Sequence, residues 1–176
     1  GGLFAIMNPF SNLPGFLSLT SDQTDAEMRR TALTVTGLTA IMAAVVVVSG
    51  DVVLKFFGIS IDDFRLAGGL VLLLIGLGML SGRDSTAHHG TSSEKATVAE
   101  WNQVACYPMT FPILVGPGTI TTILIFTGQA DSPAQHLAIW IALGGIILLI
   151  GIVFSLGRFI GKLMSQTLRA IMTRLM

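Results

Sequence analysis

Five long stretches of the chain contain no charged residue. They cover residues 1–21, 31–50, 66–82, 101–130 and 132–157. A helix that crosses the hydrocarbon core of a bilayer needs about 20 mainly apolar residues, within a range of about 17–25. Each stretch reaches that length. Only 11% of all residues are charged, whereas a soluble domain carries about 25%. The sequence therefore predicts an all-α, polytopic membrane helix bundle.

The charge and cysteine content exclude several other classes of protein. The formal net charge is zero and Lys and Arg never cluster into a basic face, so we expect no nucleic-acid partner. Cys106 is the single cysteine, which leaves no internal disulfide and no cysteine-based metal site. We expect its thiol to be buried as a small apolar group. No nucleophile–base pair or carboxylate–histidine cluster falls within the apolar stretches, so we expect no enzyme activity, metal site or cofactor.

The apolar stretches define five membrane segments, which we place at 1–20, 31–50, 66–82, 101–130 and about 133–157. The connections are a polar stretch at 21–30, an amphipathic link at 51–65, a polar linker at 83–100 and a basic amphipathic stretch at 158–176. The predicted organisation is a first three-helix repeat at 1–82, the linker at 83–100 and a second repeat at 101–176.

The basic residues predict the orientation of the chain. Only Lys55 and Arg65 follow the second segment, whereas the other eight follow the first, third and fifth: Arg29, Arg30, Arg83, Lys95, Arg158, Lys162, Arg169 and Arg174. Cytoplasmic connections of inner-membrane proteins carry the excess of Lys and Arg. We therefore expect the connections at 21–30 and 83–100 to be cytoplasmic and the N-terminus to lie outside.

Two of the segments contain the same proline pattern. Pro9, Pro14 and Gly15 in the first segment match Pro112, Pro117 and Gly118 in the fourth, each as Pro-x4-Pro-Gly, at an offset of 103 residues. Three segments separate the start of one unit from the start of the next. An odd number of crossings makes the two units run in opposite senses, which is the inverted-repeat plan of many secondary transporters.

Two prolines so close together predict a broken helix, where a single proline would indicate only a kink. Each proline removes a backbone donor and clashes with the preceding turn, at a cost of roughly 3 kcal/mol. We expect Pro14 and Pro117 each to begin a new half-helix, capped by Asn12 or Gly116. The start of a half-helix presents unpaired N–H groups that suit a carboxylate, and the preceding end presents carbonyls that suit an ammonium group or a cation.

The candidate site follows from this pattern. The predicted substrate-binding residues are Asn8, Ser11, Asn12, Gly15, Gly116, Gly118, Thr119 and Thr122, and the predicted breaks are at Pro9, Pro14, Pro112 and Pro117. No acidic residue lies deep in an apolar stretch, where proton-coupled carriers often keep one. The coupling ion is left open between Na+ and H+, with Na+ the better match to backbone and hydroxyl oxygens.

At three blocks of residues the chain resembles the MarC family, also called the neutral amino acid transporter family, and within it the YchE-like members. The blocks are Asn8-Pro9-Phe10-Ser11-Asn12-Leu13-Pro14, residues 58–69 and residues 108–120. The resemblance implies six membrane helices in two inverted halves, a bacterial or archaeal inner membrane, and transport of small neutral amino acids. Its plan is similar to that of the lysine-exporter-like transporters.

The resemblance also bears on the two ends of the chain. Arg174-Leu175-Met176 resembles the opening of the last helix of the family and parallels Arg65-Leu66-Ala67 in the first half. We therefore interpret the sixth helix as truncated, and the first segment as one that the sequence enters part-way.

The sequence thus predicts a secondary transporter of small neutral amino acids, such as alanine, glycine or serine, that works by alternating access. Its expected partners are that amino acid and the lipid bilayer, and a homo-oligomer is compatible with the pattern. The alternative is a channel or an exporter for another small solute or ion, which would show non-saturating flux without counter-exchange.

Overall fold

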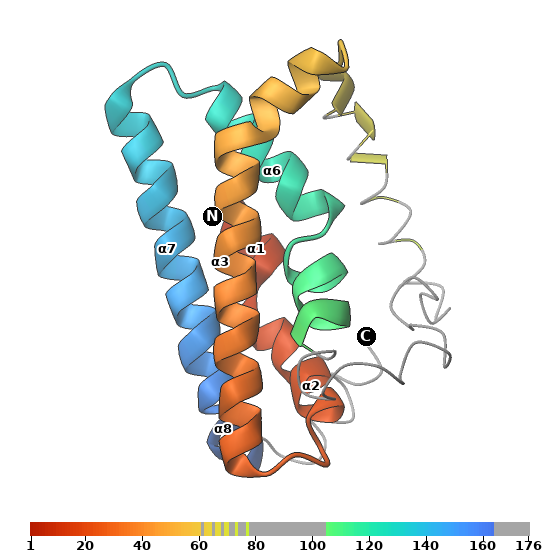
Figure 1. Ribbon diagram of the computed structural model, residues 1–176, viewed down its shortest axis with the longest axis vertical. Coiled ribbons are helices and arrows are strands. Elements are labelled where there is room, and N and C mark those ends of the chain that lie inside the picture. The colour runs from red at the N-terminus through yellow and green to blue at the C-terminus, as the bar shows by residue number, and fades with distance from the viewer. Residues whose placement is uncertain are drawn as a thin grey trace.

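The computed structural model describes residues 1–60, 62–64, 66–67, 69–70, 73, 77 and 105–163. Its elements are α1 (Gly2–Met7), α2 (Pro9–Leu19), α3 (Asp25–Phe56), η2 (Ala105–Leu114), α6 (Pro117–Gly128), α7 (Pro133–Ser155) and α8 (Gly157–Leu163). The described residues contain no strand, which confirms an all-α bundle (Figure 1). Most of the predicted third segment, the linker at 83–100 and the predicted opening of a sixth helix lie outside the described residues.

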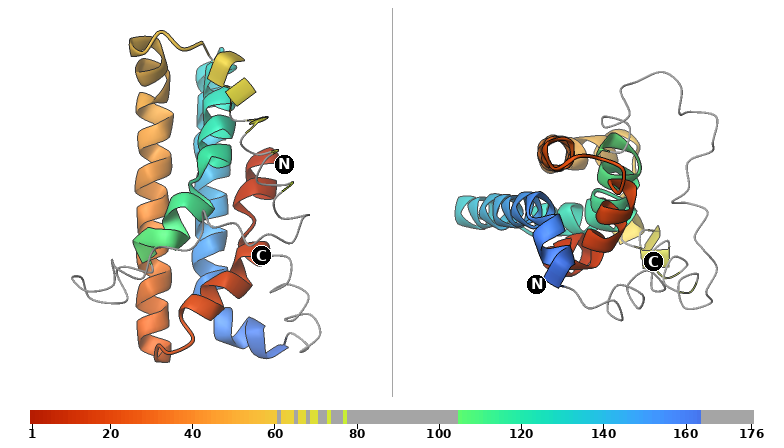
Figure 2. Two further views of the ribbon diagram at one scale, coloured as in Figure 1. Left: turned by 90° about the vertical axis from the view of Figure 1, so that its right-hand side faces the viewer. Right: turned by 90° about the horizontal axis from the view of Figure 1, so that it is seen from below.

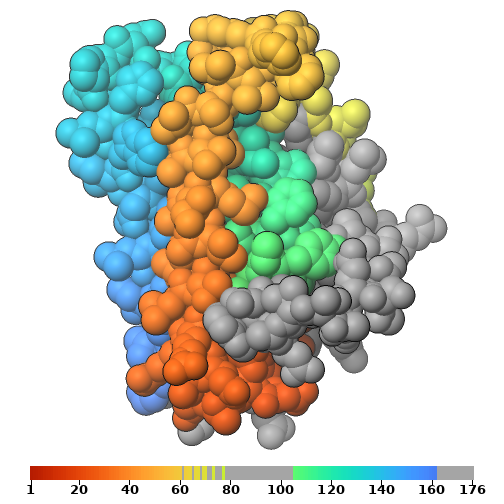
Figure 3. Space-filling view, in the orientation of Figure 1, coloured from red at the N-terminus to blue at the C-terminus, as the bar shows by residue number. Residues whose placement is uncertain are grey.

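Helix α3 is the longest described element and runs the whole length of the molecule (Figure 3). It begins at a capping box, in which the Thr24 hydroxyl accepts from the Glu27 N–H and the Glu27 carboxylate accepts from the Thr24 N–H. At the other end, Lys55 and Asp51 pair at 2.6 Å one turn apart, and the helix ends before Gly58, whose φ is +67°.

The helix is therefore longer than the predicted membrane segment at 31–50. The connection at 21–30 is a loop only up to Thr24, and the link at 51–65 is helical up to Phe56. The reason is local: the capping box starts the helix six residues before the apolar run, and the Asp51–Lys55 pair continues it beyond that run.

Helices α3 and α7 are long and apolar enough to cross a membrane, and η2 with α6 forms a third candidate span that is bent by 54°. In the most apolar 18-residue stretch of each helix, only 28% of α3 and 22% of α7 is buried inside the protein. Side chains such as Val48 and Leu148 point outward. This much exposed apolar surface on long helices is the property of a lipid-facing bundle.

The core lies where these elements meet. Helix α3 packs against α7, η2 and α6, while α1 packs against α6, η2 and α7 on the far side of the bundle (Figures 1 and 2). Phe16 of α2 stacks on Phe154 of α7, with ring centroids 4.4 Å apart. Gly151 of α7 allows close approach of α3, since a methyl group there would lie 3.0 Å from the Thr36 hydroxyl oxygen.

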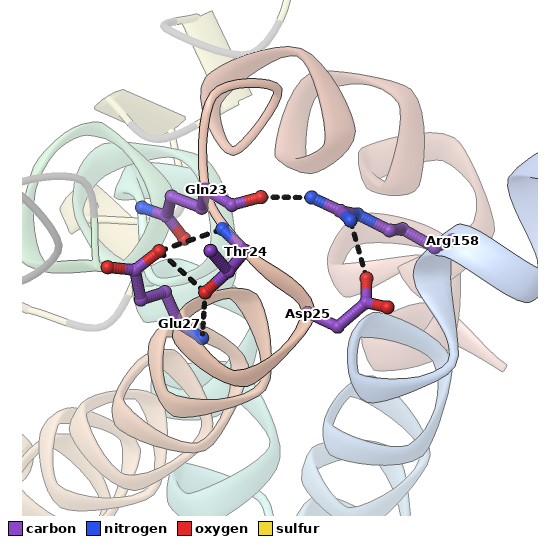
Figure 4. A network of polar contacts seen from close by, with 5 residues as sticks. All are labelled: Gln23, Thr24, Asp25, Glu27 and Arg158. Atoms are coloured by element: carbon purple, nitrogen blue, oxygen red, sulfur yellow. Dashed lines mark hydrogen bonds and ion pairs between the residues drawn. The ribbon is translucent and has the colours of Figure 1, made fainter.

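A polar network closes one end of the bundle. Arg158 of α8 pairs with Asp25 at 2.5 Å and also donates to the Gln23 carbonyl, so α8 is tied to the loop between α2 and α3 (Figure 4). Because α3 and α7 are antiparallel (Figure 1), Arg158 lies at the same end as Arg29 and Arg30, while Lys55 lies at the other. The described basic residues thus divide between the ends as predicted, and which end faces the cytoplasm stays a prediction.

One smaller expectation was wrong. Cys106 is exposed, whereas its neighbour Ala105 is fully buried. In a lipid-facing bundle an apolar thiol has no need of a protein core, so apolar character did not predict burial.

Candidate substrate site

The first predicted break lies between α1 and α2, at Asn8. Its backbone leaves the helical region at φ −38° and ψ 108°. Its side-chain oxygen accepts from the N–H groups of Phe10 at 3.0 Å and of Ser11 at 3.4 Å. Pro9 is the first residue of α2, where its missing N–H costs nothing. A single asparagine therefore ends one helix and caps the next.

The prediction that Pro14 begins this half-helix was wrong. Pro14 is buried inside α2, which starts five residues earlier. Asn12, the predicted cap, instead donates its side-chain N–H to the Asn8 carbonyl at 3.0 Å. The physical reason is that Asn8-Pro9 combines a capping acceptor with a proline at the first helical position. Pro14 has no capping residue directly before it.

The second predicted break lies between η2 and α6. Gly116 is extended at φ −89° and ψ −176°, and Pro117 is the first residue of α6, as predicted. Within η2 the backbone is also extended at Tyr107 and at Phe111. Each of these residues precedes a proline, whose ring disfavours the helical region for its neighbour. Pro112 therefore contributes to the break, as predicted.

Threonine hydroxyls bond to the carbonyls near this break. Thr110 donates to the Ala105 carbonyl at 2.7 Å, and Thr119 donates to the Leu114 carbonyl at 2.8 Å. Both bonds span five residues, as does the bond from the Val115 N–H to the Thr110 carbonyl at 2.8 Å. The hydroxyl proton of Thr119, a predicted substrate ligand, is thus used inside the protein, which leaves its oxygen as an acceptor.

The start of α6 keeps unpaired donors. The N–H groups of Gly118 and Thr119 fall in the first turn, where a helix offers no acceptor, and Gly116 provides no side-chain cap. Both residues are buried. Buried N–H groups at a helix start attract a carboxylate through hydrogen bonds and through the positive end of the helix dipole.

The structure brings the two broken segments side by side. Helix α1 packs against both η2 and α6, and a methyl group on Gly2 would lie 3.5 Å from the Phe126 ring and 4.0 Å from Thr122. Figures 1 and 2 place both breaks near the middle of the long axis of the bundle.

The predicted site residues differ in how far the protein covers them. Asn8, Asn12, Gly15 and Thr122 are half-buried, and Gly116, Gly118 and Thr119 are buried, while Ser11 is exposed on α2. Ser11 is therefore the predicted substrate-binding residue that the protein covers least.

The chemistry of the buried surface is neutral. Every buried polar side chain in the described part of the chain is a threonine: Thr20, Thr31, Thr39, Thr110, Thr119 and Thr121. No three His, Cys, Asp or Glu side chains come together among the described residues. Sequence reasoning missed Thr39 of α3, because a threonine in an apolar run carries no positional signal and only packing reveals its burial.

Comparisons with known proteins assign the chain to a family. The model of the MarC family of integral membrane proteins matches residues 1–176. The chain belongs to the MarC family. Its curated relatives include the UPF0056 membrane protein YhcE of Escherichia coli, which is 31% identical over 99% of the chain and 81% of its own length. UPF0056 membrane proteins of Aquifex aeolicus and Bacillus subtilis are also 31% identical, over 98% and 99% of the chain and 80% and 82% of their own lengths.

No solved structure matches the chain. The family and the exposed apolar helices together establish an integral membrane protein, and the names of these relatives give no substrate.

Proposed function

We propose that the chain is the core of a secondary transporter for small neutral amino acids, such as alanine, glycine and serine. It works by alternating access, without enzyme chemistry. The observation that carries this proposal is the adjacency of two broken segments at the middle of the bundle, one of which presents the buried N–H groups of Gly118 and Thr119. Broken backbone at membrane depth persists where it is buried in protein or lines a watery cavity.

The neutral lining supports a zwitterionic substrate. An amino acid carries one negative and one positive group, and its carboxylate matches the start of α6. Its ammonium group matches carbonyl oxygens that the prolines leave without donors. A fixed charge on the protein would instead favour a substrate of net opposite charge. The buried polar side chains near the breaks are threonines, which carry no charge.

The direct test is transport by the purified protein in proteoliposomes. We expect saturable uptake of labelled alanine, glycine or serine, and acceleration of efflux by unlabelled amino acid on the other side. Absence of uptake and exchange for all three would refute the proposal. Non-saturating flux without counter-exchange would favour the alternative, a channel.

A pair of threonine variants localises the site. Thr122 is half-buried on the face of α6 that meets α1, whereas the Thr127 hydroxyl is bonded within α6 to the Ile123 carbonyl at 2.9 Å. We expect Thr122→Val to raise the KM for alanine and Thr127→Val to leave it unchanged. Equal effects of the two variants would place the substrate elsewhere.

We further propose that the protein lies in the inner membrane, with the end that carries Arg158 in the cytoplasm and the N-terminus outside. The division of basic residues between the two ends supports this orientation. In a Cys106→Ser background, cysteines at Ser21 and Gln129 should react with a membrane-impermeant thiol reagent from opposite sides. Labelling of both from one side would contradict the arrangement.

A further inference from the structure

The two halves of the first broken segment pack against different parts of the protein. Helix α1 packs against α6, η2 and α7, whereas α2 packs mainly against α7 and α8. Asn8 lies between the two halves in a non-helical conformation, and its side chain and its carbonyl are bonded to residues of α2. Residues at the ends of elements commonly act as hinges. A rotation of α2 about Asn8 would therefore leave α1 packed against the second broken segment.

Helices α2 and α8 pack closely against each other at one end of the bundle. A methyl group on Gly157, the first residue of α8, would lie 3.2 Å from the Leu13 side chain and 3.3 Å from that of Leu17. Helix α8 is separate from α7, because α7 ends at Ser155 and Leu156 joins the two. Among the described elements, α3 is not a main packing partner of either α2 or α8. We call α2 and α8 together the end unit.

Arg158 connects the end unit to the start of α3. Its guanidinium pairs at 2.5 Å with Asp25, the first residue of α3, and also donates to the Gln23 carbonyl (Figure 4). The Gln23 side chain in turn accepts from the hydroxyl of Thr31, a buried residue of α3, at 2.9 Å. The planar guanidinium has several donors, so it can bind both acceptors at once. The loop that follows α2 is therefore held by α8 and by α3.

The Arg158 contacts lie where water can reach them. The Arg158 side chain is 38% exposed and the Asp25 side chain is 76% exposed. Solvent and salt weaken an ion pair in such a position, and it shifts an equilibrium by no more than about fivefold. A contact of this strength is suited to repeated release, whereas the apolar packing of α3 against α7 is continuous along both helices.

We propose that Arg158 is a gating residue. Its contacts with Asp25 and Gln23 hold this end of the protein closed, and their release lets the end unit move away from the start of α3, about Asn8 and Leu156. The inference rests on the proposed function in that it assigns the contact that closes one of the two states of alternating access. A side chain that only stabilised the fold would loosen the whole protein when removed, and fixing its contact would not stop transport.

The first experiment measures opening without any substrate. In a Cys106→Ser background, Thr20→Cys places a thiol at a buried position at the end of α2, and its rate of reaction with a hydrophilic maleimide is followed in detergent. We expect Arg158→Gln to raise this rate about fivefold. Arg158→Lys should give an intermediate rate, because an ammonium group lacks the planar fork of donors. Lys55→Gln is the matched control: it removes an ion pair of 2.6 Å that lies within α3, and should leave the rate unchanged.

A second reporter separates local opening from general loosening. Leu143 is buried in the middle of α7, and Leu143→Cys should react at the same slow rate with and without Arg158→Gln. If Thr20→Cys does not fold, Met28→Cys takes its place, because Met28 is buried in the first turn of α3. An unchanged rate at the end of the bundle in Arg158→Gln, or an equal rise at position 143, would overturn the proposal.

The second experiment fixes the contact and measures transport. Asp25→Cys and Arg158→Cys are combined and joined, in proteoliposomes, by a short bifunctional maleimide whose spacer contains a disulfide. We expect alanine exchange to fall at least tenfold and to recover when a reductant cleaves the spacer. The same cross-link between Asp51→Cys and Lys55→Cys lies within α3 and should leave exchange unchanged. Full exchange by the cross-linked Asp25→Cys/Arg158→Cys protein would overturn the proposal.

The two experiments distinguish failure of this inference from failure of the proposed function. If the natural protein moves none of the three amino acids, the proposed transport fails, and the labelling rates of Thr20→Cys alone decide whether Arg158 holds this end closed. If alanine exchange occurs and the cross-link does not slow it, the proposed transport stands and the gating role of Arg158 fails.

Discussion

The two broken segments share a proline spacing but are held in place by different means. At the first break, the side chain of Asn8 caps α2 by accepting hydrogen bonds from two of its backbone N–H groups. At the second, the backbone approaches itself so closely at Gly116 that a methyl group would collide with the Pro112 carbonyl, and two threonine hydroxyls bond to nearby carbonyls.

The same proline pattern can therefore begin a helix at either proline. Helix α2 begins at the first proline of its pattern, Pro9, whereas α6 begins at the second, Pro117. The residue before each proline accounts for where the helix begins. Asn8 caps α2 through its side chain. Gly116 has no side chain, and this lets the Pro112 carbonyl approach its backbone closely. The inverted repeat remains a prediction, and the helices that follow the two breaks begin at different prolines of the shared pattern.

The largest expected effect is at the second break. Gly116→Ala forces a methyl group against the Pro112 carbonyl, which belongs to the backbone and cannot rotate away. We expect a loss of at least about 2 kcal/mol of stability, measured as the denaturation of detergent-solubilised protein. Gly144→Ala is the control, because a methyl group there meets nothing within 4 Å. Equal stability of the two variants would show that this break is not closely packed.

Loss of the Thr119 hydroxyl, which connects α6 to η2, should have the next largest effect on stability. Thr119→Val removes the donor to the Leu114 carbonyl, which then stays unpaired in a buried position. We expect a loss of about 1–3 kcal/mol, and recovery in Thr119→Ser, by the same denaturation assay. Thr127→Val should change stability by less than about 0.5 kcal/mol, because its partner carbonyls lie within a regular helix. Unchanged stability in Thr119→Val would argue against a stabilising hydrogen bond from the Thr119 hydroxyl to the Leu114 carbonyl.

The first break should be less sensitive. Asn8→Ala removes the cap of α2 but leaves the backbone free to bond water or a neighbour, so we expect a loss of about 1 kcal/mol. Asn8→Asp and Asn8→Ser retain a capping oxygen and should lose less. A loss as large as that of Gly116→Ala would mean that the two breaks are held equally firmly, contrary to the comparison above.

The smallest expected effect concerns Pro14. In Pro14→Ala a new N–H can donate to the Phe10 carbonyl, which offsets the loss of the buried ring. We expect a change in stability of less than about 1 kcal/mol, and slow hydrogen exchange at the amide of the introduced alanine, measured by mass spectrometry. Fast exchange at that amide would indicate that a half-helix begins at position 14, as the sequence predicts.

Much of the fold was predictable because membrane insertion acts on composition. The charge-free runs identified α3 and α7 as spans, and the excess length of 101–130 agreed with a bent pair, since a continuous helix of that length would exceed the hydrocarbon thickness. Helix ends were less predictable. They depend on caps such as Thr24 and Asn8, which act over three or four residues and do not alter the hydropathy pattern.

The sequence by itself determined that this chain is a helical membrane protein of the MarC family with two interrupted segments, because charge depletion and proline chemistry act locally. Only the tertiary structure decided which proline begins each half-helix, that α1 lies against both halves of the second broken segment, and that the Thr39 hydroxyl is buried without a hydrogen-bond partner among the described residues. These depend on which faces of distant helices meet. A hydroxyl, a proline ring or a glycine acquires its role only from what packs against it.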